Sequence, residues 1–194
     1  HGCTLGRHGL KWENHTEFTT WVAFEEGLSE RPFDASAFDV FPAAWLDDAP
    51  GVRVTSILFR IDVMPMARGS FDAKALRGRL DEWFVGESLA AVSVLDGAAV
   101  VASDFRIDPA GHIRMAVFAH PDTGLRRVGR IVQRLCEIET YKSMSMLGLA
   151  RARHVSKEMG ALDQRLADLM DDMAQGASHA EHALDALMTV SAEL

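Results

Sequence analysis

Polar and apolar side chains alternate along the segment from Leu10 to Phe24. Its even positions read Trp12, Asn14, Thr16, Phe18, Thr20, Val22 and Phe24, and its odd positions read Lys11, Glu13, His15, Glu17, Thr19 and Trp21. Alternation with a period of two, rich in threonine and aromatic residues, is typical of a half-buried strand. We therefore expect one strand here, followed by a loop at Gly27–Pro32 and a short helix at Pro42–Leu46.

The next two segments predict a strand and a covering helix. Apolar residues alternate from Val52 to Val63, with a change of parity near Thr55 and Ser56 that indicates a bulge. Residues 72–84 then carry an apolar stripe of helical period, formed by Leu76, Leu80, Trp83 and Phe84. Asp72 suits the N-cap of this helix, with Phe71 and Leu76 placed as a hydrophobic staple, and Gly86 ends it.

Residues 89–119 have the pattern of a β-meander. Strands are expected at Leu89–Leu95, Ala98–Ile107 and His112–Ala119, separated by turns at Asp96-Gly97 and at Asp108–Gly111. With the two earlier strands, this predicts an α+β fold: an antiparallel sheet of about five strands, covered on one side by the 72–84 helix.

From Gly124 onward the apolar period changes to that of a helix. One face carries Leu125, Val128, Ile131, Val132, Leu135, Ile138, Met146 and Leu149. A seam of coiled-coil spacing follows at Val155, Met159, Leu162, Leu166, Leu169 and Met173. We expect Gly148 to kink or end the first helix, and Ser178, after Gly176, to cap a last one. The predicted domains are a sheet domain over 1–120 and a helical stalk or hairpin over 121–194.

Composition and charge narrow the functional classes. The 194 residues carry a net charge of −8 and a pI near 5.4, which argues against a nucleic-acid binder. Residues 121–157 hold 8 basic and 3 acidic side chains, whereas residues 158–194 hold 1 and 8. Cys3 and Cys136 are expected to be free thiols, which favours a reducing compartment. Phosphate-binding loops, dinucleotide-binding turns and nucleophile elbows are absent from the sequence, so we lean away from an enzyme.

Glu13, His15 and Glu17 form the first candidate site. On one continuous strand they would share a face, ~7 Å apart from one to the next. Two carboxylates and an imidazole suit a divalent metal or acid–base chemistry. A solvated strand face, or a polar network with Arg53 or Arg60, explains the same residues. His179 and His182 share a helical face, but solvent-exposed histidines explain that pair better.

Arginines crowd the start of the first long helix and form the second candidate site. Arg127, Arg130 and Arg134 share a face, and Arg126 lies beside them. Positive charge at a helix N-terminus is unfavourable, so a compensating anion is expected. The acidic surface of residues 158–172, in the same chain or in another subunit, is the favoured partner; a phosphorylated ligand or anionic lipid headgroups are the alternatives.

Two motifs carry a family resemblance. The run Trp12-Glu13-Asn14-His15-Thr16-Glu17-Phe18-Thr19-Thr20 and the run from Arg130 to Tyr141, which includes Glu137-Ile138-Glu139-Thr140-Tyr141, resemble a bacterial family known as domain of unknown function 3422. The resemblance covers nearly the whole chain. It implies a longer, membrane-anchored protein, with sequence before this segment and membrane spans after it, and it implies no catalytic residues.

These observations leave three functional hypotheses. The first is a non-enzymatic interaction, sensing or assembly module, which forms a homo-oligomer and is held at a membrane by segments outside this chain. The second is the soluble regulatory part of an ion-transport-like protein that senses a divalent metal. The third is a metal-dependent hydrolase that uses Glu13, His15 and Glu17. We expect no bound organic cofactor, and a location at a membrane with the soluble part facing the cytoplasm.

Overall fold

The computed structural model describes residues 1–38, 40–42, 44–45, 48–64, 73–174 and 188 of the chain. Contacts divide the chain into two units, His1–Thr140 and Tyr141–Leu194. This boundary lies later than the predicted one at 120/121. The reason is that the first turns of the C-terminal helix pack on a sheet of the first unit.

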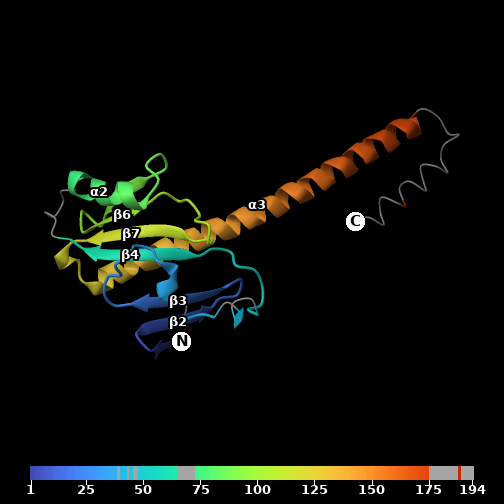
Figure 1. Cartoon of the computed structure of the whole chain (residues 1–194). Coiled ribbons are helices and arrows are strands. Elements are labelled where there is room, and N and C mark those ends of the chain that lie inside the picture. Colours follow the sequence, from blue (N-terminus) through green and yellow to red (C-terminus); the bar gives the residue numbers. More distant parts are fainter. Residues whose placement is uncertain (39, 43, 46–47, 65–72, 175–187, 189–194) are drawn as a thin grey trace. The chain divides into compact units, whose positions relative to one another are not determined.

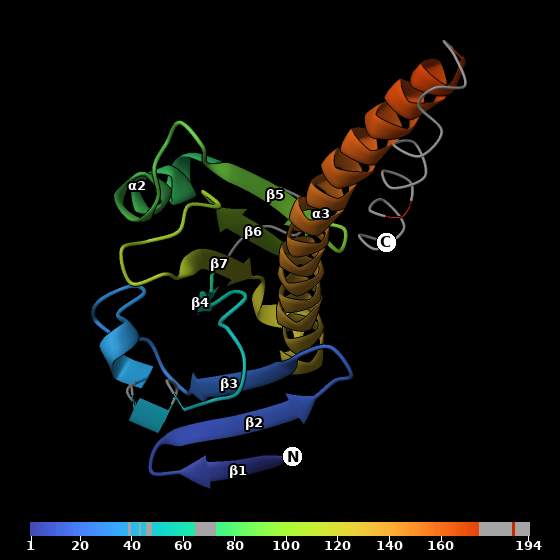
Figure 2. The ribbon, with the colours of Figure 1, turned by 90° about the vertical axis from the view of Figure 1, so that its right-hand side faces the viewer.

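The N-terminal strands form a sheet of their own (Figure 2). Strands β1 (Gly2–Leu5), β2 (His8–Asn14) and β3 (Thr19–Glu25) pair antiparallel in that order. The prediction of one strand from Leu10 to Phe24 is therefore wrong, because the chain reverses between Asn14 and Thr19. The His15 amide donates to the Phe18 carbonyl (2.8 Å), and the Thr19 hydroxyl donates to the Asn14 side-chain oxygen (2.9 Å).

The segment before the second sheet holds two short helical pieces. A 3-10 turn spans Ala35–Phe38. Ala44 and Trp45 are helical, within the helix expected at 42–46, whose residues 43 and 46 lie outside the described part. Strand β4 begins at Ile57 and not at Val52, so the predicted bulge is wrong. Ile57 is already opposite Ile113, the first residue of its partner strand, so residues 52–56 have no strand to pair with.

The second sheet has four strands in the order β4-β7-β6-β5. They are β4 (Ile57–Val63), β5 (Ala90–Val94), β6 (Ala99–Ser103) and β7 (Ile113–Ala119). Strand β4 runs parallel to β7, and the other pairs are antiparallel. The α+β class is confirmed, but the single antiparallel sheet of about five strands is wrong: the described residues form seven strands in two sheets, with one parallel pair.

Both predicted meander turns are present. Asp96 and Gly97 have φ of 56° and 78°, the left-handed conformation that a tight hairpin requires, and the Ala98 amide donates to the Leu95 carbonyl (3.2 Å). At the second turn the Gly111 amide donates to the Asp108 carbonyl (2.9 Å), with Gly111 at φ 86°.

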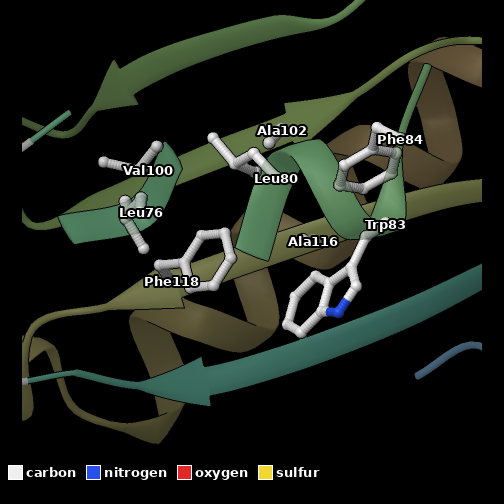
Figure 3. Packing of buried hydrophobic residues seen from close by; sticks show 8 residues of the cluster. All are labelled: Leu76, Leu80, Trp83, Phe84, Val100, Ala102, Ala116 and Phe118. Carbon is white, nitrogen blue, oxygen red and sulfur yellow. The ribbon is translucent and has the colours of Figure 1, made fainter. Parts of the chain in front are cut away.

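Helix α2 (Ala73–Trp83) covers one face of the four-stranded sheet (Figure 3). The predicted stripe is confirmed, since its four side chains are all buried. They pack on alternate residues of the two central strands: Leu76, Leu80, Trp83 and Phe84 against Val100, Ala102, Ala116 and Phe118. The expected cap and staple at Asp72 and Phe71 lie outside the described residues.

The start of helix α3 (Leu125–Ala174) covers the opposite face of the same sheet. Ile131, with Val132 and Leu135 beside it, packs against the other alternate residues, which are Ala99, Val101 and Val117. Helices on both faces explain why β6 is buried at every position. The core of the first unit is therefore three layers, α2, sheet and the first turns of α3.

Helix α3 is continuous for 50 residues (Figure 1). It passes through Gly148, so the expectation that the first helix ends at that glycine is wrong. The last predicted helix, from Ser178, lies outside the described residues. Over the residues described, the helices contain no stretch that is both long and apolar enough to cross a membrane.

Candidate functional site

The second half of α3 carries an apolar seam that is partly exposed in the part of the chain that the structure describes. Residues 141–171 contain no buried side chain, in contrast to Ile131, which is 7% exposed where the sheet covers it. Val155, Met159 and Leu166 are 38%, 59% and 43% exposed, and Leu162 and Leu169 are half-buried. The spacing predicted from the sequence thus falls on one continuous helix; the side chain of Met173 lies outside the described part.

The seam is needed to stabilise this part of the helix. Helices in proteins owe most of their stability to packing of an apolar face. Gly148 and Gly160 lie in the helix interior and each costs about 1 kcal/mol relative to alanine. Because residues 141–171 bury nothing among themselves, the described chain supplies no packing that offsets this cost. The seam is therefore the candidate interaction surface.

The arginine cluster at the start of α3 is exposed. Arg126, Arg127, Arg130 and Arg134 have no ion pair or hydrogen-bonded partner within the part of the chain that the structure describes. Their pairing with residues 158–172, within the chain or between subunits, stays a prediction. Anion or partner binding by Arg127, Arg130 and Arg134 stays a prediction.

The proposed metal ligands are not brought together. Glu13 is near the end of β2, where the Lys11 ammonium pairs with it (2.9 Å) and lowers the pKa of its carboxyl. His15 and Glu17 lie in the following turn, and the His15 ring packs on Phe18 (4.5 Å between centroids). No group of three metal-ligating side chains is placed to hold an ion anywhere in the described ranges. The strand-face argument is wrong, and the metal site stays an untested prediction.

The two histidines of the C-terminal segment, His179 and His182, lie outside the described residues. The cysteines follow the expectation of free thiols: Cys3 is exposed and Cys136 is half-buried. Burial raises the pKa of the Cys136 thiol, and the neighbouring Glu137 carboxylate raises it further. The raised pKa keeps the Cys136 thiol protonated and slow to react at neutral pH.

An aromatic cluster on the first sheet was not predicted. Trp12 lies directly opposite Trp21 across β2 and β3, and their rings stack at 5.7 Å. Trp45 meets Trp21 edge-on at 4.6 Å and stacks on Phe41. The three tryptophans stay 39–41% exposed. In one strand, positions 12 and 21 would point to opposite faces, and only the hairpin reveals that they share one.

Asp62 on β4 is a buried carboxylate that organises two arginines. It accepts hydrogen bonds from Arg60 (3.1 Å) and Arg79 (3.0 Å), while Arg60 also lies over the Trp83 ring at 5.2 Å. These side chains line a cavity of about 430 Å³ together with Glu30 and Glu82. Because Asp62 is paired with both arginines, we interpret the arrangement as a structural ion network.

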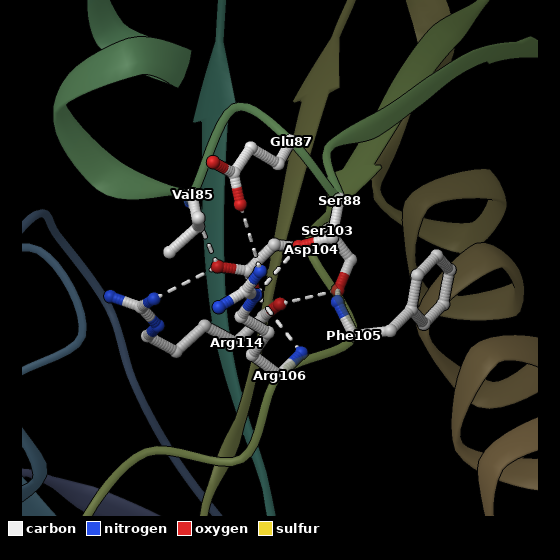
Figure 4. A network of polar contacts seen from close by, with 8 residues as sticks. All are labelled: Val85, Glu87, Ser88, Ser103, Asp104, Phe105, Arg106 and Arg114. Carbon is white, nitrogen blue, oxygen red and sulfur yellow. Dashed lines mark hydrogen bonds and ion pairs between the residues drawn. The ribbon is translucent and has the colours of Figure 1, made fainter.

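Asp104 is another buried carboxylate, and its side chain is fully inaccessible to solvent. Figure 4 shows its polar contacts. It accepts from the Val85 amide (3.0 Å), the Arg106 amide (3.2 Å) and the Arg114 guanidinium (3.0 Å). The Nε of Arg114 is buried without a hydrogen-bond partner, and the guanidinium carbon of Arg114 lies 5.8 Å from the centroid of the Phe84 ring. Asp104 thus ties the end of α2 to β6 and β7, and no local pattern in the sequence predicts this role.

Comparison with known proteins gives the family. Neither the curated proteins nor the solved structures contain a match to this chain. The family model described as "Protein of unknown function (DUF3422)" matches residues 1–194, the whole chain. The two motifs around Trp12 and Glu137 therefore indicated the right family, and the chain belongs to the DUF3422 family.

Proposed function

We propose that this chain is a non-enzymatic interaction and assembly module that works through the seam of α3. One observation carries the proposal: five apolar residues at coiled-coil spacing (Val155, Met159, Leu162, Leu166 and Leu169) are left partly or largely exposed on a helix whose described side chains from 141 to 171 include no buried one. Long exposed apolar stripes mark interaction sites.

The exposed area sets the strength of the interaction. Full burial of an aliphatic side chain contributes roughly 1.5–3 kcal/mol, so a half-exposed one gains about 1 kcal/mol on association. Five such residues on each of two helices give about 10 kcal/mol, from which the loss of translational and rotational freedom subtracts at least ~4 kcal/mol. We therefore expect weak, reversible association with a dissociation constant above about 10 µM.

The test is the mass of the 194-residue chain by light scattering from about 1 to 500 µM, a range that spans the expected dissociation constant. The mass should rise with concentration. Leu166→Glu places a charge in the seam and should keep the chain at the mass of one copy. Ala167→Glu, one residue away on the exposed side of the same helix, adds the same charge and should leave the association unchanged.

Failure of this proposal has a clear signature. A single-copy mass of 21.3 kDa at every concentration would contradict it. Equal loss of association in Leu166→Glu and Ala167→Glu would show that added charge, and not the seam, is responsible. Repetition with Mg²⁺, Mn²⁺ and Zn²⁺ tests the alternative of a metal-sensing regulatory domain or hydrolase: we expect no metal dependence.

The family resemblance supports a membrane-bound setting for the module, with spanning segments contributed by sequence outside this chain. The two free cysteines favour a module that faces the cytoplasm. Fractionation of the complete gene product into membrane and soluble pools tests this part. Recovery in the membrane pool supports it, and recovery in the soluble pool contradicts it.

A further inference from the structure

The residues beside the seam carry a charge pattern of their own. In heptad notation, Met159 and Leu166 occupy position a of the seam, and Val155, Leu162 and Leu169 occupy position d. The residues at position g, one before each position a, are Arg151, Glu158, Arg165 and Asp172. The charges therefore alternate in sign at every heptad. Residues at such flanking positions set the orientation and register of helices that pair through a and d.

We propose that the partner on the seam is a second copy of this chain, running antiparallel, with Met159 of each copy packed against Leu162 of the other. This inference rests on the proposed function. The same register brings Val155 against Leu166 of the second copy and Ala152 against Leu169. Each layer of the contact is then apolar.

This register also pairs every flanking charge with its opposite. Glu158 faces Arg165 of the second copy, and position 151, an arginine, faces position 172, an aspartate. The twofold symmetry of a dimer repeats each pair, so four favourable pairs form. On the other flank Leu149 faces Met170, and these are 41% and 65% exposed in the single chain.

A shift of one heptad reverses the electrostatics. In one direction Glu158 faces Glu158 of the other copy, and Arg151 faces Arg165. In the other direction Arg165 faces Arg165, and Glu158 faces position 172. All of these are like-charge pairs, so the alternation specifies one antiparallel register.

The same charges disfavour two other occupants of the seam, a second copy in the parallel orientation and residues 175–194 of the same chain. In a parallel pair the g position contacts the following e position, which brings Glu158 against Asp163 of the second copy and leaves no favourable pair. Residues 175–194 hold three acidic and no lysine or arginine side chains. Packed back on the acidic stretch from Glu158 to Asp172, they would repel it.

The single chain leaves Glu158 available for this exchange. It pairs with His154 one turn earlier (3.3 Å), where both side chains are about 60% exposed. A pair this exposed to solvent contributes little, because water screens it. Dimerisation replaces it with a charge pair flanking an apolar contact.

Charge reversal in the full chain tests the orientation. Glu158→Arg turns two attractive pairs into repulsive ones, and Arg165→Glu does the same. Each should weaken the dimer, measured by sedimentation equilibrium, on the order of tenfold. The double variant restores opposite charges and should return the dissociation constant to near that of the wild type. Asp168→Arg, the same charge change on the outer face of the helix, should have little effect.

The outcomes separate the two proposals. Tighter association of Glu158→Arg would indicate the parallel pair, because that variant removes the clash with Asp163; the orientation would be overturned while the assembly function stands. Equal weakening of both single variants without rescue in the double variant would overturn the register. A wild-type chain that stays monomeric throughout overturns the assembly function itself. Helical content by circular dichroism, unchanged in all variants, shows that they fold.

Discussion

Asp104→Ala should be among the most damaging single substitutions in the first unit. It deletes a fully inaccessible carboxylate that accepts hydrogen bonds from two backbone amides and from Arg114. The Val85 amide would be left in the protein interior without an acceptor, at a cost of about 1–2 kcal/mol. Arg114, whose side chain is 27% exposed, would lose a charge-assisted bond that contributes about 1.5–2 kcal/mol.

The sum is a loss of about 3 kcal/mol, a substantial part of the stability of an ordinary domain, roughly 5–15 kcal/mol. With a urea dependence of about 2 kcal/mol per molar, the unfolding midpoint should fall by about 1.5 M. Intrinsic tryptophan fluorescence follows the transition, because Trp83 is buried against Phe118 in the same unit. Asp104→Asn keeps an oxygen acceptor and should lose about half as much.

A matched control separates burial from charge. Asp81 pairs with Arg77 at 3.2 Å on the exposed side of α2, so Asp81→Ala should lower the midpoint by no more than about 0.3 M. Arg114→Met combined with Asp104→Asn should cost less than the sum of the two single changes, since neither partner is left unpaired. Similar midpoints for Asp104→Ala and Asp81→Ala would refute this reasoning.

Three further changes test other parts of the fold. Leu80→Ala opens the core under α2 and should cost about 2–5 kcal/mol in urea unfolding; a cost below about 1 kcal/mol would contradict the burial of this face. A side chain at Gly9 would overlap the Phe24 ring across the hairpin, so Gly9→Ala should cost about 1 kcal/mol, and Phe24→Ala should remove that penalty. At pH 7–8 iodoacetamide should modify the exposed Cys3 first and Cys136 slowly. Because the pKa of Cys136 is raised, its modification rate should rise at a higher pH than the rate of an ordinary thiol does. Mass spectrometry of the peptides measures both rates.

The elements that the sequence predicts well are those with strong local signals. The Asp96-Gly97 and Asp108–Gly111 turns carry residues that adopt left-handed backbone conformations, and the α2 stripe has a clear helical period. The first hairpin was missed because its turn, from His15 to Phe18, contains no glycine, proline or Asp-Gly pair. The hairpin also moves the shared face from even positions such as Trp12 to odd positions such as Trp21, a change that no residue type marks in the sequence.

Other features depend on contacts between distant residues. The parallel pairing of β4 with β7 joins residues more than 50 positions apart, and nothing local near Ile57 distinguishes it from antiparallel pairing. Asp104 and Asp62 look like ordinary surface residues in the sequence, and only the fold brings arginines to them. The expectation that Gly148 ends the helix is wrong because one glycine in a helix costs about 1 kcal/mol, which does not stop a long helix.

Hydrogen exchange of the full chain at two concentrations, one well below and one well above the dissociation constant, tests the central claim most directly. If a second copy covers the seam, amides between Ala152 and Leu169 should exchange more slowly at the high concentration, while those of β6 and β7 stay the same. Exchange of the 152–169 segment at the same rate at both concentrations would contradict the assembly proposed for α3.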